Sequence, residues 1–259
     1  TIEVPISTHN LITGNVYTIS IKVSQGGNLT EEKIFVELEN NPPDITINLS
    51  GYDLKIDIED KNWDQFVYSV KLNGNNLIET YDGRANAEGK ITFRKVFDSS
   101  YVNIGEQNVI EVYAEDVYGA KSEAVHRFIG EYYGLLFADE NYQLYSTDLG
   151  EVLKVMKIPP LRAGEISDIH KVILINKQPF KVRDIRLWLN YYEKVPNTIL
   201  KFSKTKEPFM LEDELLYEGV FEPYEEIEFF VRLFTNRGAK GNGKFNVVAR
   251  AIPILDGEG

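Results

Sequence analysis

The sequence predicts an all-β protein made of tandem antiparallel β-sandwich modules, and three observations carry this prediction. Apolar and polar residues alternate in short segments along most of the 259 residues. Glycine, asparagine and proline interrupt these segments at regular spacing, as expected for turns between strands. Tyrosine and phenylalanine, which favour strands, occur 15 and 14 times, and helical periodicity is almost absent.

Residues 1–41 predict a partial N-terminal β module. The segments 17–23 and 32–39 alternate, and the stretch SQGGNLTE joins them as the loop of a hairpin. The stretch NNPPD at 40–44 ends the second strand, because its two prolines remove backbone donors and stiffen the chain. The sequence begins at Thr1 without a methionine, so we expect a segment of a longer polypeptide.

Residues 42–130 predict a complete sandwich of short strands. The Asn-Gly pair at 73–74 is a strong turn signal, since it follows an alternating run. Another alternating run spans 108–116. Its period of two residues places three apolar side chains on one face: Ile110, Val112 and Ala114.

Residues 131–259 predict a third, larger sandwich. Its expected strands contain the sequences HKVILINKQ, VRDIRLWLNYY, TILKFSKT, EIEFFVRLFT and FNVVARAIPI. The segment 211–221 fits a helical turn or a strand, and its pattern does not decide between them. In the second and third modules we expect these residues to face the cores: Ile56, Ile58, Ile110, Val112, Ile173, Ile175, Phe229 and Val231.

The composition excludes several classes of function. The net charge is −12, which repels nucleic-acid phosphates and anionic lipid surfaces. There are no cysteines, so disulfides and thiolate metal sites are excluded. No apolar run approaches the length of a membrane-spanning helix, so we expect no membrane insertion.

Three stretches of the second module resemble one class of domain. NPPDITI, IEDKNWDQFVYSVKLNG and NVIEVYAEDVYGAKSEA are similar to immunoglobulin-like or fibronectin-III-like modules of bacterial and phage surface proteins. In such modules a strand ending in Ala-x-Asp is followed by a Tyr-Gly corner, and the corresponding residues here are Ala114, Asp116, Tyr118 and Gly119. The resemblance covers about residues 42–130.

The third module resembles a different β-sandwich, found in tail and other virion-associated proteins of phages that infect Gram-positive bacteria. The stretches VILINKQPFKVRDIRLWL, LKFSKTKEPF and EEIEFFVRL carry this weaker similarity. Together the two resemblances imply a structural or host-contact role without enzyme activity.

The corner after residue 115 predicts a turn and leaves a second role open. Gly119 permits the positive φ of a tight corner, and Asp116 is placed to accept hydrogen bonds from the backbone N–H groups that follow it. The alternative is that Asp116 shares a calcium ion with an acidic loop elsewhere in the chain.

That acidic loop is DIEDKNWDQ. Asp60, Asn62 and Asp64 follow the D-x-N-x-D spacing of calcium loops, in which alternate oxygens converge on a hard cation. Our hypothesis is that these three residues bind Ca²⁺ together with Asp57 or Glu59. The rest of the EF-hand pattern is absent, so a solvated loop between strands is the competing interpretation.

No motif predicts catalysis or a bound cofactor. The stretch GAKGNGKF at 238–245 matches the glycines and lysine of a P-loop, but Phe245 replaces the hydroxyl residue that holds Mg²⁺. We therefore predict a hairpin tip between two antiparallel strands there. The three histidines lie far apart in the sequence, and no serine stands in G-x-S-x-G.

Aromatic residues offer one candidate interaction surface. Trp188, Tyr191 and Tyr192 lie close together in the segment 183–192 and would stack on sugar rings or fill a protein pocket. Alternation places Trp188 and Tyr192 opposite a face of isoleucine and leucine. The competing interpretation is that another part of the same chain covers these aromatic side chains.

The preferred function is a phage virion component, in a tail or fibre, whose rigid modules serve as spacers and binding surfaces. The alternatives are a bacterial surface or secreted glycan-binding module and the accessory domains of a glycoside hydrolase. Expected partners are other virion or surface proteins, cell-surface glycan, or further copies of this chain in a homo-oligomer. The expected location is the virion or the cell surface.

Overall fold

The computed structural model describes residues 14–78 and 89–254 and confirms the all-β prediction. A single 3₁₀ turn, Ser99–Tyr101, stands beside sixteen strands in this part of the chain. No helix in the described ranges is long and apolar enough to cross a membrane. The chain divides into two compact units, one consisting of residues 1–49, 53–97 and 106–129, and the other of the remaining residues. The boundaries at 41 and 130 stay predictions.

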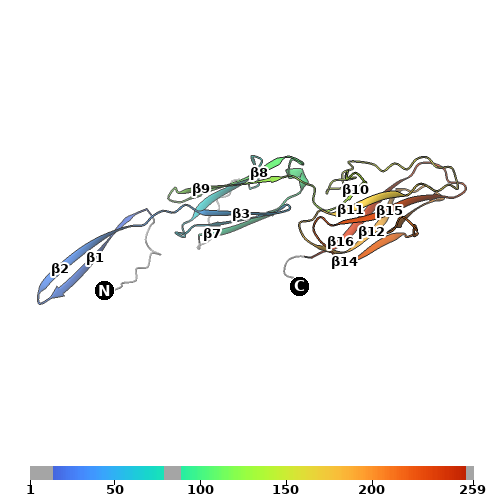
Figure 1. Ribbon diagram of the computed structural model, residues 1–259. Coiled ribbons are helices and arrows are strands. Elements are labelled where there is room, and N and C mark those ends of the chain that lie inside the picture. Colours follow the sequence, from blue (N-terminus) through green and yellow to red (C-terminus); the bar gives the residue numbers. More distant parts are fainter. Residues whose placement is uncertain (1–13, 79–88, 255–259) are drawn as a thin grey trace. The chain divides into compact units, whose positions relative to one another are not determined.

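The predicted N-terminal hairpin is present. Strand β1 (Val16–Gln25) pairs antiparallel with β2 (Asn28–Glu37) along its full length (Figure 1). The turn between them uses Gly26 and Gly27, whose φ angles of 59° and 91° favour residues without a Cβ atom.

Two antiparallel sheets form the sandwich that follows. The order of the first sheet is β3 (Asp44–Ser50), β4 (Asp53–Glu59) and β7 (Lys90–Val96). The order of the second is β6 (Asn75–Asn76), β5 (Phe66–Leu72), β8 (Gln107–Asp116) and β9 (Lys121–Ile129). Asn73 and Gly74 have positive φ angles of 52° and 77°, as the Asn-Gly turn signal predicts.

The core of this first sandwich lies between inward-facing residues of its central strands. Ile110, Val112 and Ala114 are all buried, which confirms the predicted face of β8. The neighbouring strands contribute further buried residues: Leu54, Ile56, Ile58, Phe66, Tyr68, Val70 and Leu72. The polar residues between them face outward, so alternation in the sequence accounts for the packing.

Two further sheets form the second sandwich. One has the order β10 (Leu135–Ala138), β11 (His170–Asn176), β15 (Glu226–Thr235) and β13 (Thr198–Ser203). The other has the order β14 (Glu214–Phe221), β12 (Val182–Glu193) and β16 (Lys244–Pro253). The undecided segment 211–221 is therefore mostly strand.

The core of the second sandwich draws residues from both sheets. Phe229 and Val231 lie in its main cluster, together with Leu187 of β12. Ile173 and Ile175 are also buried, but they belong to a separate small cluster with Ala138. Strand β11 is buried on both faces, which explains why its stretch VILI is continuously apolar.

The prediction that residues 238–245 form a hairpin tip is wrong. Strands β15 and β16 belong to different sheets, so the loop between them connects the two layers of the sandwich. Alternation identifies each strand, but the pairing of strands depends on contacts that are distant in the sequence.

Candidate metal centre

The loop between β4 and β5 is shaped by the carboxylate of Asp60. Its Oδ1 atom accepts hydrogen bonds from the backbone N–H groups of Asn62, at 2.8 Å, and Asp64, at 3.2 Å. Its carbonyl oxygen accepts from the N–H group of Trp63 at 3.1 Å, and Trp63 takes a positive φ of 67°. The loop is thus a compact turn in which only one carboxylate oxygen of Asp60 is used.

The same kind of turn follows β8 and confirms the predicted corner. The Oδ1 atom of Asp116 accepts from the N–H groups of Tyr118, at 2.8 Å, and Ala120, at 2.9 Å. Gly119 has a φ of 91° and donates its N–H to the carbonyl oxygen of Asp116 at 3.2 Å.

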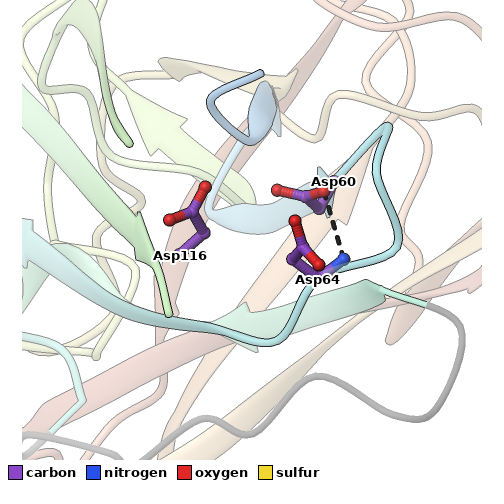
Figure 2. A group of neighbouring side chains, drawn as sticks. All are labelled: Asp60, Asp64 and Asp116. Carbon is purple, nitrogen blue, oxygen red and sulfur yellow. Dashed lines mark hydrogen bonds between the residues drawn. The ribbon is translucent and has the colours of Figure 1, made fainter. Parts of the chain in front are cut away.

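Strand pairing brings the two turns together. Phe66, at the start of β5, is the register partner of Asp116, at the end of β8. Asp60 and Asp64 precede Phe66 in the chain, so their loop lies beside the Asp116 turn. Each of the three aspartates offers a carboxylate oxygen, and these oxygens lie within 4.8 Å of one another around a common space (Figure 2).

Two of the three aspartates are buried, and one oxygen of each has no hydrogen-bond donor. Asp60 is 1% exposed and Asp116 is 4% exposed. The Oδ2 atom of each is buried without a hydrogen-bond partner, and no lysine or arginine within the described ranges pairs with either carboxylate. Burial raises the pKa of Asp60, and the negative charges of Asp64 and Asp116 raise it further.

Asn62, which the sequence predicts as a calcium ligand, holds the segment before β3. Its Oδ1 atom accepts the N–H of Asn41 at 2.9 Å, and its Nδ2 atom donates to the carbonyl oxygen of Glu39 at 3.0 Å. Asn40 lies between these two contacts. Its own Oδ1 atom is buried and has no hydrogen-bond partner.

Asp57 and Glu59, the other predicted ligands, have different partners. Asp57 pairs with Lys55 at 2.8 Å and accepts a hydrogen bond from the Thr92 hydroxyl at 2.6 Å, while Glu59 pairs with a lysine of β7. Both side chains alternate with the buried residues of β4, so they point away from the core. One more step along the chain returns Asp60 to the inward-facing side.

The donor set has the chemistry of a hard-cation site. The three carboxylates supply only oxygen, with no imidazole or thiolate among them. Oxygen-only sites suit Ca²⁺ and Mg²⁺, whereas zinc and copper prefer nitrogen and sulfur. The sequence assigns no role to Asn40, whose only distinguishing sign is its position in the Asn-Asn pair before two prolines.

The predicted aromatic surface is described only in part. Trp188 lies half-buried on β12, and the guanidinium carbon of Arg186 lies 6.0 Å from the centre of its ring. The side chains of Tyr191 and Tyr192 lie outside the described residues. On the same strand Ile185 and Leu187 are buried, which confirms that the alternate residues face the core.

A pocket of about 310 Å³ lies in the second unit, lined by Tyr145, Met156 and His170 among other residues. An ion pair between Asp139 and Lys154 also lines it. No serine or cysteine is among the residues that line this pocket.

No protein-family model matches the sequence, and no curated protein is similar to it. Solved structures give weak similarities. A membrane-anchored protein from Corynebacterium diphtheriae is 11% identical with a TM-score of 0.28, and the alignment covers 94% of this chain and 67% of that one. The SusE-like protein BT2857 is 12% identical with a TM-score of 0.25, over 82% of this chain and 97% of that one.

A chitinase, ChiA74 from Bacillus thuringiensis, is 13% identical with a TM-score of 0.20, and the alignment covers 79% of this chain but 29% of the chitinase. At such TM-scores these similarities carry no argument about function. Assignment to a virion stays a proposal.

Proposed function

We propose that this chain is a non-enzymatic structural and interaction protein that works on a virion or a cell surface. Its β-sandwich modules serve as spacers, and its N-terminal hairpin binds another protein chain. The apolar face of the hairpin formed by β1 and β2 is the observation that carries this proposal.

Cross-strand pairing defines that face. Register partners lie on the same side of a hairpin, and the pairs include Tyr17 with Val36 and Ile19 with Ile34. The period of two residues adds Ile21 and Val23 to the same side, where they pair with Glu32 and Thr30. Ile21, Val23 and Ile34 are exposed by 49%, 59% and 49%.

The opposite face of the hairpin is more polar, although Val16, Leu29 and Phe35 are also exposed there. It carries Lys22, Glu31 and Lys33, and Glu31 lies 3.8 Å and 3.9 Å from the ammonium groups of the two lysines. A two-stranded hairpin is marginally stable by itself in water. Contiguous exposed apolar surface commonly marks a protein–protein contact. The face with Ile19 and Ile34 is therefore the more apolar of the two, and it is the side that we propose for the partner.

Sedimentation velocity of the full chain over a range of concentrations tests this proposal, with a second copy of the chain as the available partner. We expect self-association that Ile34→Lys abolishes, since a charge on the apolar face opposes burial there. Lys33→Ser is the matched control on the opposite face and leaves association unchanged.

Amide hydrogen exchange gives the second measurement, because the natural partner can be a different protein. In the monomer we expect fast exchange throughout β1 and β2. Slow exchange in a monomer, independent of concentration and unaffected by Ile34→Lys, means that the chain itself covers this face, and it contradicts the proposal.

A second candidate function is glycan binding in the second unit. The half-buried Trp188 with Arg186 at 6.0 Å favours it, because the accessible part of an aromatic ring can stack on a sugar. A glycan array distinguishes the two roles: binding that Trp188→Ala removes supports a bacterial glycan-binding module. Co-purification with phage tails supports the virion.

A further inference from the structure

We propose that Asp60, Asp64 and Asp116 form a Ca²⁺ site in the first sandwich and that Asn40 supplies a further oxygen ligand. The bound ion fastens the segment before β3 to the two aspartate turns. This proposal is independent of the partner of the hairpin and of any glycan.

The charge of the cluster is the first reason. Three carboxylates lie together, and two of them are almost fully buried. Burying a carboxylate without a counter-charge is costly, and placing like charges together adds to the cost. A divalent cation at the centre offsets both, leaving one net negative charge.

The second reason is that the two oxygens of each buried carboxylate have different surroundings. Asp60 and Asp116 each use Oδ1 to fix a turn, at distances from 2.8 to 3.2 Å from the backbone nitrogens. Each leaves Oδ2 buried and without a donor. Both side chains are therefore held in place by their own turns while one oxygen remains available for an ion.

The segment before β3 supplies the third reason. Asn62 binds the backbone of Glu39 and Asn41, on either side of Asn40. The buried Oδ1 atom of Asn40 lacks a donor, although buried amide oxygens are normally satisfied. An amide oxygen is a common Ca²⁺ ligand, so one ion would satisfy Asn40, Asp60 and Asp116 together.

The geometry favours Ca²⁺ over Mg²⁺. Ca²⁺ accepts six to eight oxygens at about 2.3–2.6 Å in irregular arrangements and combines carboxylates, amides and water. Mg²⁺ requires a nearly regular octahedron at about 2.0–2.1 Å and keeps most of its water. The three aspartates come from two separate turns, which suits the more tolerant ion.

Trp63 provides a built-in probe, because it lies in the loop between Asp60 and Asp64. Tb³⁺ substitutes for Ca²⁺ in oxygen sites and emits when a nearby tryptophan is excited at a wavelength that tyrosine does not absorb. In the full chain we expect sensitised Tb³⁺ emission that Ca²⁺ displaces with a dissociation constant between about 10⁻⁶ and 10⁻³ M. Trp63→Phe removes the emission, whereas the matched Trp188→Phe retains it.

Isothermal titration with CaCl₂ then measures the ion directly in the unmodified chain and in two variants. Asp116→Asn keeps an oxygen for the turn but removes a negative ligand, and we expect it to lower the affinity at least 100-fold. Asp139→Asn makes the same change in the second unit and leaves the affinity unchanged. Circular dichroism verifies that each variant is folded.

The opposite results are equally clear. Absence of Ca²⁺ binding up to roughly 10 mM overturns the proposal, because this concentration is well above the dissociation constants of the weakest extracellular Ca²⁺ sites. A proton shared between the carboxylates would then be the neutralising charge. Binding that survives Asp116→Asn places the ion elsewhere. Equal affinity for Mg²⁺ overturns the choice of ion.

Discussion

The turns at Asp60 and Asp116 in the first unit can be compared with a third turn, at Asp139, in the second. All three accept two backbone N–H groups at one carboxylate oxygen, and in the third turn these come from Asn141 and Gln143, both at 2.9 Å. All three place a residue with positive φ three positions after the aspartate: Trp63, Gly119 and Tyr142.

The difference lies in what neutralises the second carboxylate oxygen. Lys154 pairs with Asp139, and this contact lowers the pKa of that carboxyl. Asp60 faces other carboxylates, and its pKa is raised by burial and by their charge. The same local turn therefore occurs with two ways of neutralising its aspartate. In the second unit the charge is neutralised by a lysine of the chain, and in the first unit, as we propose, by a cation from solution.

The largest expected effect comes from a substitution that unfolds the first sandwich and leaves only the turn of the second unit. Val112 is buried in β8, the strand that carries Asp116. Val112→Asp places an unpaired charge in the core and should cost about 4 kcal/mol or more, enough to unfold this sandwich alone. Calorimetry should show loss of one unfolding transition, while Glu111→Gln on the outer face keeps both.

A smaller change separates the shape of the Asp60 loop from its charge. Gly89 has a φ of 62°, and a Cβ atom added there would lie 2.7 Å from the Cα atom of Trp63. Gly89→Ala should destabilise the first unit by about 1–3 kcal/mol and weaken Ca²⁺ binding.

At Gly119 an added Cβ would meet nothing within 4 Å. Gly119→Ala should therefore cost only the backbone strain, about 1 kcal/mol. Equal losses in chemical denaturation would show that the contact with Trp63 is unimportant.

Substituting asparagine in each kind of turn sharpens the comparison directly. In EDTA, Asp116→Asn should raise the stability of the first unit, because it removes repulsion between buried carboxylates. Asp139→Asn should lower the stability of the second unit, because it breaks the pair with Lys154. Urea denaturation measures both, and a loss of stability in both variants would mean that the two turns are electrostatically alike.

The smallest expected effect is the change with pH in the stability of the second unit. Since Lys154 and the turn lower the pKa of Asp139 below its usual 3.8, the folded state holds the ionised form. This contribution is present above the pKa of the unfolded chain and is lost as the pH falls through the folded pKa. The melting temperature of the second unit should therefore fall more steeply below about pH 4 in the unmodified chain than in Asp139→Asn.

Much of this architecture is predictable from the sequence because alternation and turn residues are local signals. The hairpin, the strand faces around Val112 and the turn at Asp116 follow from them. The loop between β15 and β16 was mispredicted, because sheet membership depends on distant contacts. The spacing of Asp60 and Asp64 predicts two members of the cluster, whereas Asp116 is predicted first as a turn residue and only alternatively as a ligand.

The sequence does not predict the structural role of Asn62, and the reason is specific. Its spacing matches a calcium loop, but its side chain binds the backbone at Glu39 and Asn41. That choice depends on where the segment before β3 lies, which alternation does not determine. For the same reason the buried amide oxygen of Asn40 emerges only from the folded arrangement.

Differential scanning calorimetry of the full chain, with Ca²⁺ and with EDTA, tests the central claim most directly because it observes both units in one experiment. At a Ca²⁺ concentration about 100 times the dissociation constant, the transition of the first unit should rise by roughly 10 °C. The transition of the second unit, whose aspartate turn already has its lysine, should stay in place. The account would be contradicted if Ca²⁺ changed neither transition temperature, or if it raised both by the same amount.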